Sequence, residues 1–256
     1  MDTILLGTLG GLVAMAATTI GALPALIGRS LSQRASDTML GFAAGVMLSA
    51  AYFSLILPGI DVATERTGSE LVAALIAGAG IVLGAGFVAW LNATIPHEHF
   101  RTGPEGRDTE AVARIWLFVI AITIHNFPEG LSIGVAFGEG QANGLSVMTG
   151  ISIQDMPEGL AVAVAVTGLG YSRRTAFLTA LASGAAEPLG AFVGAALVSV
   201  SHALLPWGLT FAAGAMLYVI SHEIVPETHR NGHQHRATAG LIVGLVVMML
   251  LDVTLG

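Results

Sequence analysis

The sequence predicts an all-α, polytopic membrane protein with eight transmembrane helices in a single domain, residues 1–256. Two of the three supporting observations concern composition: 54% of the 256 residues are hydrophobic and only 11% are charged, and the mean hydropathy is +0.78. A soluble domain carries roughly 25% charged residues, so this surface suits lipid rather than water. The third observation is that eight apolar segments are about as long as the roughly 20 residues that cross the hydrocarbon core as a helix.

The expected spans are residues 3–28, 37–60, 69–95, 113–138, 144–168, 173–200, 203–225 and 237–255. The first lacks the basic stretch that opens a signal peptide, so we expect it to be retained as a span. A polar segment, about 96–112, separates the third span from the fourth and contains His97 and His99. This segment is either a solvated connector or a weak metal-collecting tract.

Spans 4 and 5 each combine several polar residues with an internal proline. Pro128 and Pro157 have no N–H to donate to the carbonyl groups of Ile124 and Ile153, so each proline kinks its helix. Irregular backbone is tolerated in a membrane where it is buried in protein or lines a wet cavity. Spans 4 and 5 are therefore expected to carry the functional site of the protein.

The chain has a palindromic pattern, in which span 2 matches span 7 and span 4 matches span 5. FAAGAML at 211–217 in span 7 repeats FAAGVML at 42–48 in span 2, and a proline follows each at a similar distance. Spans 2 and 7 run in opposite directions, as do spans 4 and 5, which share the sequence PEGL. Inverted repeats are typical of secondary transporters, whose substrate site lies near the midplane of the bilayer. In span 6, Glu187 directly precedes Pro188 and adds an acid beside a similar break.

Orientation follows from the arginines. Nine of the ten lie in or beside the loops after spans 1, 3, 5 and 7, and only Arg66 lies on the other side. Because cytoplasmic loops carry the excess of positive charge, these four loops are expected in the cytoplasm and both termini in the periplasm.

Spans 4 and 5 repeat one pattern of ligand-type side chains. In each, a glutamate follows one polar residue by four positions and another by three, so the three share a helix face. The residues are His125, Asn126 and Glu129 in span 4, and Gln154, Asp155 and Glu158 in span 5.

These groups predict a site for a divalent cation. Charged side chains at mid-membrane cost several kcal/mol each on insertion scales, and no arginine or lysine lies deep in a span to offset them. Imidazole, carboxylate and amide groups suit Zn²⁺, Cd²⁺, Fe²⁺ or Mn²⁺, whereas a chain without cysteine suits Cu⁺ poorly. The two glutamates can also bridge a pair of metals. The ion is expected as transported substrate, with no cofactor.

A stripe in span 2 suggests the route to this site. Met47, Ser54 and Asp61 are seven residues apart, so they share one helix face from the midplane to the outer surface. The stripe either lines the access route or packs against neighbouring spans.

HNFPEG (125–130), QDMPEG (154–159) and AAEPLGA (185–191) resemble motifs of the ZIP (Zrt-, Irt-like protein) metal transporters, in particular the bacterial GufA-like branch. The resemblance covers essentially the whole chain. It implies a 3+2+3 arrangement in which helices 1–3 and 6–8 are related by inversion. It also implies import of zinc and related ions into the cytoplasm, across the bacterial inner membrane, by alternating access.

The resemblance also assigns roles to residues. A primary metal site would use His125, Glu129, Gln154 and Glu158 with Met47, and a second site Asn126, Asp155 and Glu187 together with both bridging glutamates. Asp61 and Asp252 would lie at the outer mouth, and His222 and Glu223 on the cytoplasmic exit path. The stripe described above adds Ser54 to the outer access route, and the histidine-containing loops add His97, His99 and His229 to the exit. Many relatives have histidine where this chain has Gln154 or Asp155, which leaves the preference among zinc, cadmium and iron open.

Two other function classes fit the residues less well. An intramembrane metalloprotease needs a histidine pair such as HExxH, but the sequence HEIVP has Pro226 in place of the second histidine. A carrier of protons or monovalent cations gives no role to His125 and Met47. The expected protein is thus no enzyme, and its partners are divalent ions and the lipid bilayer, not nucleic acid. GxxxG pairs occur in four spans, which is compatible with a homodimer but selects no dimer face.

Overall fold

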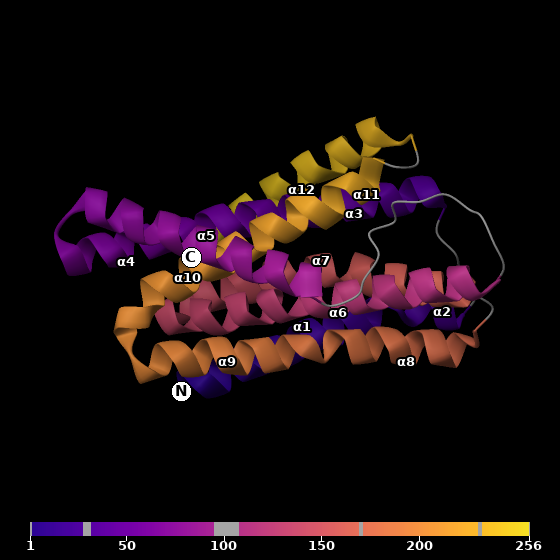
Figure 1. Cartoon of the computed structure of the whole chain (residues 1–256), viewed down its shortest axis with the longest axis horizontal. Coiled ribbons are helices and arrows are strands. Elements are labelled where there is room, and N and C mark those ends of the chain that lie inside the picture. Colours follow the sequence, from indigo (N-terminus) through magenta and orange to yellow (C-terminus); the bar gives the residue numbers. More distant parts are fainter. Residues whose placement is uncertain (1, 28–31, 95–107, 169–170, 230–231, 256) are drawn as a thin grey trace.

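The computed structural model describes residues 2–27, 32–94, 108–168, 171–229 and 232–255 (Figure 1). Every regular element among these residues is helical. The elements are α1 (Thr3–Gly21), α2 (Leu23–Leu26), α3 (Gln33–Ser49), η1 (Ala50–Ile56), α4 (Leu57–Thr67), α5 (Glu70–Thr94), α6 (Asp108–Glu139), α7 (Gln141–Gly168), α8 (Arg173–Gly184), α9 (Ala186–Val200), η2 (His202–Leu204), α10 (Leu205–Val219), η3 (Ile220–Ile224), α11 (Val225–His229) and α12 (Gln234–Leu255).

Long apolar helices confirm a multi-pass membrane protein. Five stretches in the described part of the chain are long and apolar enough to cross a bilayer. They are Thr3–Leu26, Asp37–Thr67, Glu70–Leu91, Arg173–Val200 and Gln234–Thr254. Their side chains are exposed over much of their surface, including Leu71, Val82 and Val253, as expected where lipid replaces water around the protein.

Helices α6 and α7 lie in the middle of the bundle (Figure 1). Helix α6 packs against α1, α9 and α10, while α7 packs against α1, α3 and α8. Both helices continue through their internal prolines, Pro128 and Pro157. The central position buries the polar faces of both helices among their neighbours. The sequence analysis expected this burial, because polar groups and irregular backbone are tolerated in a membrane only inside the protein.

Four of the expected spans contain a break or a change of helix type. The first divides near Pro24 into α1 and α2, and the sixth divides at Ala185 into α8 and α9. The second and seventh each contain a π-helical segment, η1 and η3, just before Pro58 and Pro226. Because proline cannot donate the ordinary α-helical hydrogen bond, the turn before it readily takes another register. The sequence analysis did not predict these π-helices.

Glycines let two pairs of helices pack closely. A Cβ at Gly45 of α3 would overlap the carbonyl oxygen of Leu241 in α12, and a Cβ at Gly214 of α10 would overlap that of Ile81 in α5. Gly45 and Gly214 occupy the same position in the two FAAG sequences. The equivalent motifs therefore make equivalent contacts, each with a different partner helix.

Candidate metal centre

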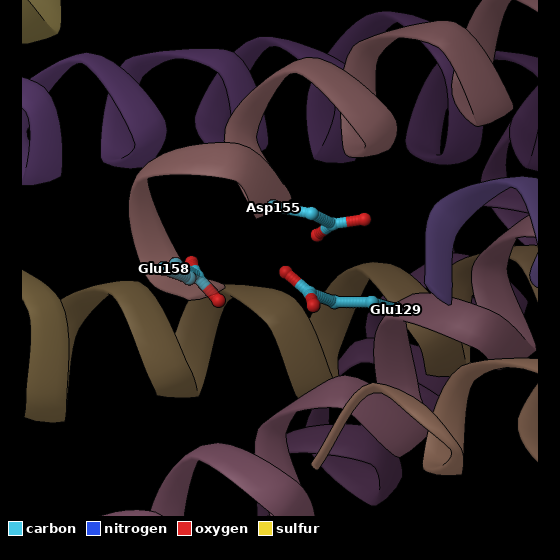
Figure 2. Close-up of side chains that lie close together, drawn as sticks. All are labelled: Glu129, Asp155 and Glu158. Atoms are coloured by element: carbon cyan, nitrogen blue, oxygen red, sulfur yellow. The ribbon is translucent and has the colours of Figure 1, made fainter. Parts of the chain in front are cut away.

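Three acidic side chains from α6 and α7 meet in the protein interior. Glu129, Asp155 and Glu158 each offer one carboxylate oxygen, and these oxygens lie within 4.8 Å of one another. Figure 2 shows the three carboxyl groups turned toward one another. Their residues are at most 4% exposed. The arrangement places acids from the repeated patterns of α6 and α7 on facing sides of the two helices.

Gln154 ties two of these acids together. Its Nε2 donates hydrogen bonds to Oε1 of Glu129 and, at 2.8 Å, to Oδ1 of Asp155. Within the described part of the chain, Oε1 of Gln154 and Oδ2 of Asp155 are buried without a hydrogen-bond partner. A buried polar atom in this condition costs free energy unless a further group or ion contacts it. Both oxygens are of the kind that a divalent cation binds.

Glu187 lies beside this group on α9. It is fully buried, and its charge is close enough to that of Asp155 for the two to repel. The hydroxyl of Thr18 in α1 donates a 2.7 Å hydrogen bond to Oε1 of Glu187. Thr18 was missed by the sequence analysis, because a lone threonine in an apolar helix usually bonds to its own backbone. Thr18 does so too, with the carbonyl of Ala14 at 3.3 Å.

The other predicted metal-site residues are placed as follows. Asn126 is buried, and its Nδ2 donates to the carbonyl of Ser183 in α8 at 3.0 Å. Met47 is buried on α3, the helix that packs against α7. His125 lies in α6 four residues before Glu129. The roles expected of the His125 and Glu223 side chains, and of His97 and His99, concern groups outside the described part of the structure.

The predicted outer access route converges on Asp252 of α12. Ser54 Oγ donates to Oδ1 of Asp252 at 2.5 Å, and Ser146 Oγ of α7 donates to the same oxygen at 3.3 Å. Ser54 and Ser146 are at most 1% exposed, so the residues expected to line the route are packed against their neighbours at this level. Ser146 was not predicted, since nothing in its local sequence separates it from an ordinary packed serine.

Additional acids surround this closed region. Asp61 is exposed on α4, and Glu139 ends α6. Burial raises the pKa of the Glu139 carboxyl above its usual value, a hydrogen bond with Asn143 offsets part of the rise, and the nearby Asp252 and Asp61 raise it further. Carboxylates that repel one another in this way produce a negative potential at this end of the bundle.

Histidines gather at the opposite ends of α3, α10 and α12. His222 is exposed in η3 with its ring against Tyr218, and Nδ1 of His229 bonds to the carbonyl of Val225 at 2.8 Å. Nδ1 of His233 lies 2.7 Å from Oδ2 of the buried Asp37. The sequence analysis did not predict the His233–Asp37 pair, whose members are 196 residues apart in the chain.

Known proteins are similar to this chain over most of its length. A family model described as ZIP zinc transporter matches residues 94–252. The chain is 50% identical to zinc transporter ZIPB of Bordetella bronchiseptica, over 97% of this chain and 81% of that protein. It is 45% identical to zinc transporter GufA of Myxococcus xanthus, over 98% and 99% of the two chains. It is 32% identical to the human zinc transporter ZIP11, over 93% and 94%.

Proposed function

Because the chain belongs to the ZIP zinc transporter family, we propose that it imports Zn²⁺ and related divalent cations into the cytoplasm. One observation carries the proposal for this chain: Glu129, Asp155 and Glu158 place carboxylate oxygens within 4.8 Å of one another in the interior of a membrane protein. Such charges repel unless a cation or protons offset them. A divalent ion satisfies all three at once.

The primary site consists of His125, Glu129, Gln154 and Glu158, with Met47 adding a thioether. A second site consists of Asn126, Asp155 and Glu187 and shares the two glutamates, which bridge the ions. The short separation of the three acids supports a shared site. The buried oxygens of Gln154 and Asp155 without hydrogen-bond partners support it too.

Transport takes place by alternating access in an eight-helix, 3+2+3 domain that covers residues 1–256. Ions reach the site past Asp61, Asp252 and Ser54 and leave past His222 and Glu223, joined by His97, His99 and His229. The matching contacts of the two FAAG sequences support the inverted repeat. The protein lies in the bacterial inner membrane with both termini in the periplasm, as the arginine distribution favours.

The two rival functions have less support. The relatives with the highest identities above are transporters rather than enzymes, and the sequence HEIVP lacks the second histidine of a zinc protease. A monovalent-cation carrier does not need several carboxylates and a buried amide oxygen around one point. The inference of a divalent substrate therefore rests on the number of oxygen ligands as well as on the family.

The proposal is tested by zinc uptake into proteoliposomes that enclose a zinc-sensitive dye. Wild-type protein should fill the vesicles with zinc, and Glu129→Gln should lower the initial rate by more than about tenfold, since even outer groups of metal sites contribute 10–100-fold to affinity or activity. Glu65→Gln, at an exposed position on α4, is the matched control and should transport normally. Folded wild-type protein that took up sodium but no zinc would overturn the proposal.

A further inference from the structure

A carbonyl group in η1 receives a hydrogen bond from another helix. In an α-helix, the carbonyl of Ser54 would accept a hydrogen bond from residue 58, but Pro58 has no N–H. Nδ2 of Asn143, near the start of α7, donates to this carbonyl at 3.0 Å. Asn143 is only 9% exposed. The side chain from α7 thus bonds to the backbone of the π-helical segment just before Pro58.

Asp252 of α12 makes a second connection between η1 and α7. Its Oδ1 accepts from Ser54 on η1 and from Ser146 on α7. Three segments far apart in the sequence, η1, α7 and α12, are therefore connected by hydrogen bonds at one level of the bundle. Ser54 and Ser146 are almost completely buried there, so an ion cannot pass this level unless the helices separate.

Asn143 is the residue best placed to control this separation. It bonds to Ser54 on one side and also to Glu139 at the end of α6. It thereby links the pair α6–α7, which carries the acidic cluster, to η1, which carries the expected access stripe. Opening the route exchanges the bond to Ser54 for a bond to water.

We propose that Asn143 is a positioning residue that holds the outer access route closed through its hydrogen bond to the carbonyl of Ser54. The claim that this closure controls metal import rests on the proposed function. The claim that Asn143 keeps the helices together at this level does not. An amide–carbonyl hydrogen bond of ordinary net strength shifts a two-state population by about twofold to tenfold. Loss of the bond should therefore shift the protein toward the outward-open state without removing any metal ligand.

The test uses accessibility from outside, because the chain has no cysteine of its own. Ala50, in η1 four residues before Ser54, is fully buried and is replaced with cysteine as a reporter. Intact spheroplasts are treated with a membrane-impermeant thiol reagent in buffer that contains a chelator. Adding Asn143→Leu, which keeps a similar size but cannot hydrogen-bond, should speed labelling by about twofold to tenfold. Gln141→Ala, an exposed amide on the same helix, is the matched control.

A second measurement avoids the reporter cysteine, which itself occupies a packed position. Hydrogen–deuterium exchange of residues 50–56 in the full-length protein should be faster in Asn143→Leu than in wild type, and unchanged in Gln141→Ala. Equal exchange and equal labelling in all three proteins would overturn the proposal. Because both measurements omit metal, a failure of zinc uptake in wild-type vesicles would refute the proposed function and leave this result standing.

Discussion

Glu129 and Glu158 carry the largest share of the proposed chemistry, because they stand between two ligand sets. Neighbouring side chains cannot take over the bridging role of either glutamate. Gln154 is neutral, and Asp155 contacts only one of the two proposed ions. Removal of a bridging glutamate should weaken both sites, whereas removal of a one-sided ligand should weaken one.

Counting the bound metal ions tests whether Glu129 and Glu158 bridge two of them. Crystals grown with Cd²⁺ should show two anomalous peaks in the wild type and one in Asp155→Ala, where the second site loses a ligand. Glu129→Ala and Glu158→Ala should show neither at full occupancy, since each loss removes a negative charge from both sites. Two full peaks in Glu129→Ala would rule out a shared ligand while leaving transport itself untouched.

Thr18 offers a second residue-level prediction. Thr18→Val keeps the shape of the side chain but removes the hydroxyl that donates to Glu187. A hydrogen bond to a charged group contributes about 1.5–3 kcal/mol, so the unfolding temperature in detergent should fall. Thr19→Val is the control, because the Thr19 hydroxyl donates to the carbonyl of Met15 in its own helix. Equal unfolding temperatures for the two variants would show that the bond to Glu187 adds nothing.

At the scale of elements, the two halves of the chain share their irregularities as well as their motifs. η1 and η3 each follow a FAAG sequence and precede a proline, and the breaks near Pro24 and before Pro188 fall in the first and sixth spans. Met216, which corresponds to Met47 in the repeat, accepts a hydrogen bond at its sulfur from Ser132 of α6. Irregular helices allow backbone groups to bond across the bundle, as Ser54 does with Asn143.

Close packing between α5 and α10 predicts different effects on stability for two glycine substitutions in α5. A Cβ at Gly84 would overlap the carbonyl oxygen of Phe211, whereas a Cβ at Gly86, two residues on, meets nothing within 4 Å. Gly84→Ala should therefore cost about 1–3 kcal/mol of stability, the usual price of overpacking. Gly86→Ala should be neutral or stabilising, because alanine favours a helix over glycine. Thermal unfolding in one detergent compares the pair, and a Gly84→Ala protein as stable as Gly86→Ala would contradict the predicted contact.

For the whole molecule, the distribution of arginine fixes the expected direction of insertion. With nine arginines on one side and Arg66 on the other, we expect the loop 96–112 in the cytoplasm and both termini in the periplasm. The direction matters for function, because import requires the acids Asp61, Glu139 and Asp252 to face the metal supply.

Single introduced cysteines test the orientation. In intact spheroplasts, an impermeant thiol reagent should modify Ser69→Cys, at the start of the third span, but not Thr102→Cys in the following loop. Both should react after the membrane is permeabilised, which controls for the reactivity of each thiol. Modification of Thr102→Cys alone in intact spheroplasts would reverse the orientation.

The sequence by itself determined the class of protein, the candidate ligands and the family. Composition is enough to identify lipid as the solvent, and helical periodicity is enough to place Glu129 with Asn126, or Glu158 with Asp155, on one face. These are local properties, since residues three or four apart in a helix are neighbours whatever surrounds them.

Only the tertiary structure decided which faces meet. The pairs Thr18–Glu187 and Ser54–Asn143 join residues 169 and 89 positions apart, and no local pattern marks Thr18 or Asn143. The rotation and depth of each helix depend on close contacts such as Gly45 against Leu241, which involve a second helix. Periodicity fixes a face within one helix, but packing between helices fixes what that face touches.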